Sequence, residues 1–429
     1  MPFFLIAGRA VADIGAAVII IGFLGHCLIT KDWRFLHKPW FIIGTILWAW
    51  LVLILGWQEL ARQNMASHLG FMRFLLLAAA LECWLGQQKL FNRWLPWSLG
   101  IAIIFTLICV WHQRITGYNI RGLEIEPGTG RLHGPFADLL AGSYLAKNAW
   151  LWLLPMGWWL HQQSARFFSA FIWFFLLTII TLTIFITGER VAMVTYMAGI
   201  GLSFIFFHNW RKFFVIAAIF LSLSGAGLLV MKDDLRSRLY RVNSEQTSHF
   251  SDSIYSKIWQ QAAQIVKNQP LIGEGIAAMR HHCIAMPPEK IVQGPVQPFC
   301  ALHAHQPLFE WATTGGIIAL SLFMILIFMI IHPICPQLWH GNPATPFLWA
   351  GILSILSFLP PLLPVMSTLN NWNGIYLWWV MGVILAKATP MASLPLLQKA
   401  TPDACPIETT KENQHPCKEV ENIQSRSPQ

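Results

Sequence analysis

The sequence predicts an all-α, polytopic membrane protein with about eleven to twelve transmembrane helices. Of the 429 residues, 55% are hydrophobic and 11% are charged, whereas soluble domains carry about 25% charged residues. Apolar runs long enough to cross a bilayer recur along the chain, without the alternating pattern of a membrane barrel. Because backbone groups in lipid must satisfy their own hydrogen bonds, these runs are expected to be helices.

Hydropathy predicts eleven spans in order. We expect Pro360, Pro361 and Pro364 to break the tenth one. The spans lie near residues 10–30, 39–57, 71–86, 95–112, 137–160, 167–187, 191–208, 213–231, 308–333, 346–366 and 374–388.

The basic residues predict the orientation of these spans. The net charge of +9 comes from short Lys and Arg clusters between apolar runs, which indicates membrane topology rather than nucleic-acid binding. Loops 31–38 and 86–94, Arg166 and the pair 211–212 fall on one side, expected to be cytoplasmic. The N-terminus is then outside and the C-terminus inside. The outer loops are 58–70, 113–136, 187–190, 232–307 and 366–373.

The domain organisation is simple. Residues 1–388 are expected to form one transmembrane domain, and the polar, Pro-containing residues 389–429 a disordered cytoplasmic tail. No cleavable signal peptide is expected, because Arg9 and Asp13 interrupt the first apolar residues and no small-residue cleavage site follows. Without a soluble catalytic domain, any chemistry must lie in the membrane-facing loops.

The long outer loop, 232–307, contains one predicted helix. In residues 253–267, Ile254, Ile258, Ala262 and Ile265 share a face, which predicts an amphipathic helix lying against the membrane. Residues 268–275 then form a predicted turn.

Histidine and arginine supply the candidate chemistry. His303 and His305 end the polar loop, just before an apolar run, and an imidazole there can accept a proton near neutral pH. Arg190 lies in a short turn between two apolar spans, where its guanidinium can bind a phosphate through two hydrogen bonds. The structural alternatives are an interfacial histidine that only packs, and an arginine that reaches for the interface or pairs with Glu189.

Other polar residues are weaker candidates for a functional role. Glu82 and Lys147 lie within or near apolar spans, where a charge indicates either function or an interfacial position. Cys283 and Cys300 both fall in the outer loop and are candidates for a disulfide, and no metal-binding spacing occurs. Further cations on the outer side suit an anionic lipid headgroup or diphosphate, although most are expected to be solvated: Arg114, Arg121, Arg131, Arg236, Arg238, Arg241, Lys257 and Arg280.

Three motifs, in this order, resemble the O-antigen ligase and polymerase superfamily of bacterial membrane glycosyltransferases. The first is Thr187-Gly188-Glu189-Arg190, which opens a span. The second, residues 268–275, is similar to the family's Asn-Pro-Leu-x-Gly-x-Gly stretch. In the third, His305-Gln306 is followed by nine residues and Gly316, a pattern typical of the ligase branch.

The resemblance implies an inverting transfer of glycan from undecaprenyl diphosphate to an acceptor hydroxyl, without metal or nucleotide. In ligases the acceptor is lipid A–core, and the reaction takes place at the periplasmic face of the inner membrane. Arg190 would bind the diphosphate and stabilise its charge as it leaves. His305 would orient or deprotonate the acceptor hydroxyl, with His303, Gln306, Tyr255 and Glu189 in support.

The chain departs from the family in three places. Members often carry a second arginine four residues before a tryptophan of the amphipathic helix, but Tyr255 precedes Trp259 here. Three residues after Gly316 stands Ala319, where the family has Gly, Thr or Tyr. Most members also begin inside, with one more span. The candidates to replace the second arginine at the donor diphosphate are Lys257, Arg241 and Arg280.

An O-antigen ligase is therefore the leading hypothesis. An O-antigen polymerase is the alternative, because Gly201 follows Arg190 at a spacing that polymerases use. A protein O-oligosaccharyltransferase would usually have a further C-terminal soluble region. A lipid-linked glycan transporter would be expected to have internal repeats and charged residues near the membrane midplane. The sequence shows no clear repeat and few such charges.

Overall fold

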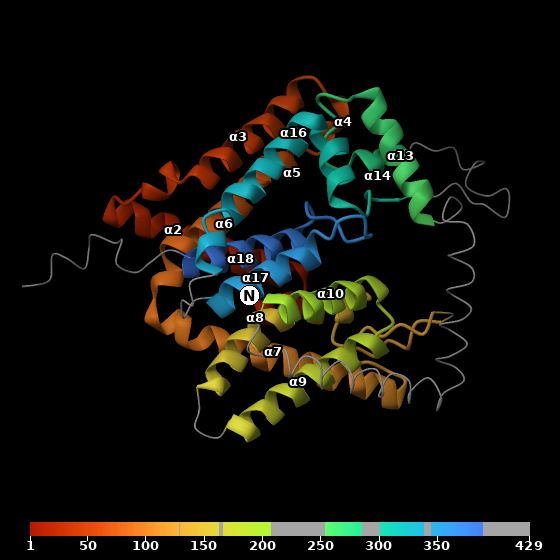
Figure 1. The fold of residues 1–429 in the computed structure, drawn as a ribbon. Coiled ribbons are helices and arrows are strands. Elements are labelled where there is room, and N and C mark those ends of the chain that lie inside the picture. The colour runs from red at the N-terminus through yellow and green to blue at the C-terminus, as the bar shows by residue number, and fades with distance from the viewer. Residues whose placement is uncertain (128, 163–165, 207–253, 285–300, 339–344, 389–429) are drawn as a thin grey trace, which may run out of the picture. The chain divides into compact units, whose positions relative to one another are not determined.

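The computed structural model describes residues 1–127, 129–162, 166–206, 254–284, 301–338 and 345–388. These residues form helices and no β-strand (Figure 1), which confirms the predicted all-α class. The 3-10 helices are Arg34–His37, Ile54–Gly56, Leu85–Gln87 and Cys335–Leu338. The α-helices are α1 (Pro2–Ala7), α2 (Arg9–Thr30), α3 (Pro39–Leu53), α4 (Glu59–Gln63), α5 (Met65–Gly70), α6 (Met72–Cys83), α7 (Lys89–Thr116), α8 (Ala141–His161), α9 (Arg166–Ile186), α10 (Arg190–Phe206), α13 (Ile254–Asn268), α14 (Ala278–Ile284), α16 (Pro307–Ile331), α17 (Thr345–Phe358) and α18 (Asn371–Ala388).

Ten of the eleven predicted spans coincide with helices, and the range 213–231 lies outside the described residues. Within the described part, six helical segments are long and apolar enough to cross a membrane: Arg9–Thr30, Pro39–Gly56, Met65–Gln87, Lys89–Thr116, Phe168–Ile186 and Pro307–Ile331. The tenth span is shorter than predicted. Helix α17 ends at Phe358, before Pro360 and Pro361, because proline removes a backbone donor and clashes with the preceding turn. The predicted tail 389–429 lies outside the described residues.

Helices α8 and α18 are buried along nearly their whole length. Helix α8 contacts α7, α9, α10 and α17, and α18 contacts α2, α6 and α17. Lys147 is buried on α8, where its Nζ donates to Asn373 Oδ1 at 2.7 Å and lies 4.5 Å from the ring centroid of Phe358. Glu82 is also buried and accepts hydrogen bonds from Lys38 Nζ and Trp40 Nε1 at 3.0 and 2.9 Å. Both charges therefore have satisfied structural partners.

The amphipathic helix forms as predicted, as α13, but its apolar face is not turned to the membrane. Ile258, Ala262 and Ile265 pack with Met279 of α14 and with Ala304, beside α16. Figure 1 shows α13 and α14 next to the first part of α16. The expectation that this face lies against lipid is wrong, because amphipathicity identifies an apolar face but not the surface that covers it. Ile254, at the start of the helix, is exposed.

Candidate active site

The turn between α9 and α10 is fastened to the N-terminus of α8 by Glu189. This buried carboxylate accepts hydrogen bonds from the backbone amides of Gly142 and Ser143 at 2.7 and 2.9 Å. An anion is stabilised there by the free amides and by the helix dipole. Burial raises the pKa of Glu189 to about 7, although the charge of Arg131, the two amides and Lys147 oppose that rise. The turn, and Arg190 at the start of α10, are thereby fixed relative to α8.

Arg131 lies directly against this turn. Gly188 has a φ of +74°, and a Cβ added to it would lie 3.2 Å from Arg131 Cγ. The neighbouring Leu132 amide donates to Thr187 O at 3.1 Å. Burial lowers the pKa of Arg190, and the charge of Arg131 lowers it further, whereas Tyr255 raises it. Two guanidinium groups within electrostatic reach of each other form a cationic site suited to a phosphate or diphosphate.

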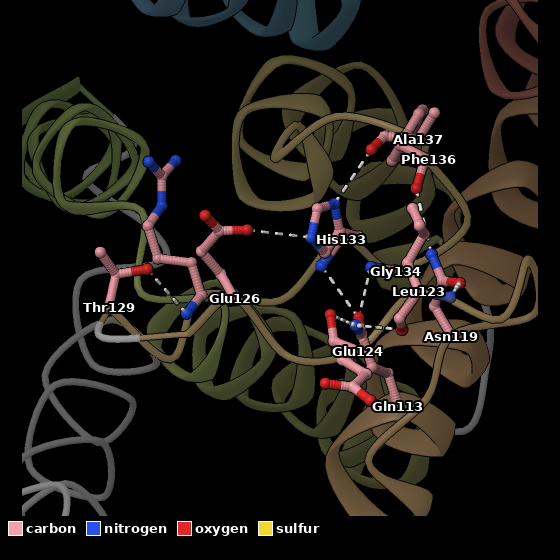
Figure 2. A network of polar contacts seen from close by, with 11 residues as sticks. Gln113, Asn119, Leu123, Glu124, Glu126, Thr129, His133, Gly134, Phe136 and Ala137 are labelled. Carbon is pink, nitrogen blue, oxygen red and sulfur yellow. Dashed lines mark hydrogen bonds and ion pairs between the residues drawn. The ribbon is translucent and has the colours of Figure 1, made fainter.

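The loop that carries Arg131 is held by a buried amide side chain (Figure 2). Gln113, near the end of α7, accepts from the backbone amides of His133 and Gly134, both at 2.9 Å. His133 also lies 3.5 Å from a carboxylate oxygen of Glu126, and Asn119 Nδ2 donates to Phe136 O at 3.1 Å. The loop is thus an ordered part of the site. Sequence reasoning placed Arg131 among the outer-side cations, most of which were expected to be solvated, and did not single it out.

Tyr255 connects the arginine turn to the histidines. Its ring centroid lies 6.0 Å from that of His305, in an edge-on arrangement. The ionised form of its phenol raises the pKa of Arg190, which places the two side chains within electrostatic reach of each other. The His303 and His305 ring centroids are 3.8 Å apart. Arg190, Tyr255, His305 and His303 therefore follow one another from the turn into the loop before α16. Tyr255 stands where the family has its second arginine.

Both histidines are held in the neutral form. Burial, and to a lesser extent the charge of Arg280, lowers the pKa of His303 to about 4. Burial also lowers the pKa of His305 to about 4; His303 adds to this, and a hydrogen bond with the Val365 backbone opposes it. A neutral imidazole has one ring nitrogen free to accept a proton. His305 is therefore neutral near pH 7 and can accept a hydrogen bond or a proton from a hydroxyl, although its lowered pKa weakens it as a base.

The backbone at His305 is strained and is fixed on both sides. His305 has a φ of +51°, a left-handed conformation that is uncommon for residues other than glycine. Its carbonyl accepts from the Val365 amide at 2.7 Å. Gln306 is buried and caps α16, with Oε1 accepting from the Phe309 amide at 2.7 Å. The amide or hydroxyl side chain that the motif places after its histidine is therefore explained as a helix cap.

The second and third motifs dock against each other through their backbones. The amides of Glu274 and Gly275 donate to Thr313 O and Thr314 O at 2.9 and 2.8 Å, and the Ile317 amide donates to Pro270 O at 2.9 Å. Helix α16 breaks at Gly315 and Gly316. A Cβ on Gly316 would lie 2.1 Å from Leu271 O, so only glycine allows this approach. These contacts position the short helical segment that follows His305.

The other residues predicted to belong to the site do not all lie near Arg190 and His305. Arg280 is exposed on α14 and acts electrostatically on His303 rather than on Arg190. Lys257 lies on α13, and no contact among the described residues joins its ammonium to Arg190 or His305. Cys283 is disulfide-bonded, whereas Cys300 and Arg241 lie outside the described residues, so the Cys283–Cys300 pairing stays a prediction. Within the described part, no group of three or more His, Cys, Asp or Glu side chains is arranged to hold a metal ion.

Fold and site together define a helical, multi-pass membrane protein in which arginines and neutral histidines meet at the loops of a helix bundle. Residues 173–324 match the family model of the O-antigen ligases. The matched segment contains Arg190, Tyr255, His305 and Gly316. It supports membership of the chain in the O-antigen ligase and polymerase superfamily, whose members are glycosyltransferase-like enzymes. A search of curated proteins finds no match.

Proposed function

We propose that the protein is an O-antigen ligase of the bacterial inner membrane. It transfers a polysaccharide from undecaprenyl diphosphate to a sugar hydroxyl of lipid A–core, at the periplasmic face. The observation that carries this proposal is the path from Arg190 through Tyr255 to His305. A cation suited to bind a diphosphate and a neutral imidazole both lie near one tyrosine, an arrangement that suits a displacement at a sugar carbon.

The proposed reaction is a single inverting displacement. The acceptor oxygen attacks the anomeric carbon of the donor glycan, and its proton passes to the free ring nitrogen of His305. The bond between the anomeric carbon and the diphosphate oxygen breaks, and its electron pair stays on the diphosphate. Arg190 stabilises this growing negative charge. No metal or nucleotide takes part in these steps.

Arg131 supplies the second guanidinium in this proposal. The family's second arginine is replaced by Tyr255, whose phenol is uncharged at neutral pH. Arg131 reaches the same turn from the α7–α8 loop, beside Gly188. Of the replacements considered from sequence, Arg280 acts on His303. Lys257 remains a weaker candidate for the donor, and Arg241 lies outside the described residues.

A polymerase is the second candidate, and the Arg190–Gly201 spacing favours it. In α10, nothing lies within 4 Å of a Cβ added to Gly201. Packing within the described residues therefore does not require glycine at this position, in contrast to Gly316. The His305-Gln306 motif, with its helix cap and its glycine contact, argues for the ligase branch.

The test is complementation of a ligase-deficient bacterium that makes lipid-linked O-antigen and the matching lipid A–core. Lipopolysaccharide gels would compare the parent with Arg190→Ala, Arg131→Ala and His305→Ala at equal membrane expression. Arg62→Ala is the matched control, because Arg62 is an exposed arginine in another predicted outer loop. We expect a ladder on lipid A–core with the parent and the control, and its loss with the other three.

Different outcomes identify the alternatives. A glycan that lengthens on its lipid carrier without joining the core would favour the polymerase. Glycan transferred to protein would favour the oligosaccharyltransferase. Full activity of His305→Ala in moving lipid-linked glycan across the membrane would favour a transporter, since that class does not use a base.

A further inference from the structure

A cavity of about 450 Å³ is lined in part by His303, whose ring lies beside that of His305. Its wall comes from segments far apart in sequence: the start of α2, α5 and the residue before it, residues 276–280, residues 302–304, the first turns of α16 and residues 366–372. Four of these contributions belong to loops that the sequence assigns to the outer side. The volume falls in the range of about 300–1,000 Å³ that is typical of small-ligand sites.

The wall of the cavity is held by buried hydrogen bonds. The Glu310 carboxylate accepts from the amide and the hydroxyl of Thr368 at 2.8 and 2.7 Å, which fixes residues 366–369 against α16. Opposite, His68 Nε2 accepts from the Ile276 amide at 3.0 Å, which fixes α5 to the turn after Gly275. Such a wall requires little rearrangement on binding, which favours affinity.

The lining combines apolar side chains with polar groups and includes Arg9, Arg280 and the buried carboxyl of Glu310. Asn64, Ser67 and Asn370 offer amide and hydroxyl groups, which suit the hydroxyls of a sugar. Arg9 lines one edge but pairs with Asp138 at 2.5 Å. Arg280 forms no ion pair with a carboxylate among the described residues, and its charge acts on His303. An exposed guanidinium without a partner carboxylate, facing a polar cavity, suits a ligand with an anionic group.

His303 fixes the relation between this cavity and the proposed donor site. It lines the cavity, and its ring lies beside that of His305, which in turn contacts Tyr255. A continuous series of side chains that includes the proposed base therefore joins the cavity to the cationic turn. A donor held at Arg190 and an acceptor held in the cavity would both be within reach of this series.

We propose that this cavity binds the terminal sugars of the acceptor and that Arg280 binds an anionic group on them. The inference rests on the proposed transferase function and extends it by assigning the acceptor subsite and the charge of the acceptor. By resemblance, Arg280 was a candidate to bind the donor diphosphate. This inference assigns it to the acceptor instead.

The test uses the full chain in proteoliposomes with lipid-linked donor and three lipid A–core acceptors, in which the core carries phosphate, uronic acid or no anion. Initial rates give separate KM values for donor and acceptor. We expect Arg280→Gln to raise KM about tenfold for the anionic acceptors, the loss expected for one charge-assisted hydrogen bond. The KM values for the neutral acceptor and the donor should stay within about twofold. The acceptor whose KM rises, the one with phosphate or the one with uronic acid, identifies the anionic group that Arg280 binds.

A second variant fills the cavity. Ser67 is exposed at its edge, so Ser67→Trp adds bulk without disturbing the core. It should raise KM for all three acceptors and leave the donor KM unchanged, whereas Arg62→Gln should change neither. If Arg280→Gln raises the donor KM instead, or Ser67→Trp leaves every acceptor KM unchanged, the acceptor subsite is wrong and the transferase function stands. A parent protein that transfers glycan to no acceptor would overturn the proposed function and this inference together.

Discussion

Replacing Gly316 with alanine should separate two backbone segments on which the candidate site depends. Gly316 has φ +68° and ψ −167°, a conformation that costs a residue with a Cβ about 1–3 kcal/mol. The new methyl would lie 2.1 Å from Leu271 O, so the segments must move apart. That movement breaks the Ile317–Pro270 hydrogen bond, a further loss of about 1 kcal/mol. The strain and the lost hydrogen bond together destabilise the protein by about 2–4 kcal/mol.

The matched control is Gly201→Ala. Gly201 also lies in a helix, but nothing lies within 4 Å of an added Cβ, so alanine should be neutral or stabilise by up to about 1 kcal/mol. Unfolding of the purified proteins by SDS in mixed micelles gives both free energies, and a transfer assay gives activity. We expect Gly316→Ala to be much less stable and inactive. Equal stability of the two variants would refute the argument that Gly316 is required for the docking of these motifs.

Three further predictions concern the same loops. The pKa of His305 is lowered from 6.5 to about 4, so transfer should be constant from about pH 6 to 8 and fall only toward pH 4; a midpoint near 6.5 would contradict its burial. The stability of the fold should fall with pH in the same direction as activity. The contribution of the neutral ring is fully present above pH 6.5 and is lost as the pH falls toward 4. Glu189→Ala removes the cap of α8 and should cost about 1–2 kcal/mol in SDS unfolding, with Glu189→Gln losing less because it keeps an acceptor oxygen. Gln306→Ala should lower the free energy of unfolding by about 1 kcal/mol in the same assay, and Gln306→Asn should lower it by less. An unchanged free energy in Gln306→Ala would mean that the α16 cap contributes nothing.

Hydropathy predicted the helices well because lipid leaves the backbone few alternatives to a helix. The range 10–30 became α2, and the turn at 187–190 lies where it was predicted. Long-range packing carried no such signal. The apolar face of α13 was recognisable from its period, but its cover, α14 and the start of α16, was not.

The site divides in the same way. Arg190 and His305 could be proposed from the sequence because each stands in a local pattern. Arg131 was not singled out because its loop meets the turn at Gly188 only through tertiary contacts, and a charged loop residue is usually solvated. The glycine beside Arg190 was the available signal in the sequence, since a glycine often marks a close approach of another segment.

The proposal that Arg131 supplies the second guanidinium in place of Tyr255 can be tested by a double substitution. Arg131→Gln should lower kcat/KM at least tenfold, because it removes one of two charges from the donor site. If Tyr255 occupies the place of the family's second arginine, Tyr255→Arg should restore most of that loss in the Arg131→Gln background, since residue 255 lies within electrostatic reach of Arg190. Gln260→Arg, which adds a positive charge at an exposed neutral position of the same helix α13, is the control and should restore nothing. Equal rescue by both arginines would mean that added charge near the loop is sufficient, and that neither Arg131 nor residue 255 has a specific position in diphosphate binding.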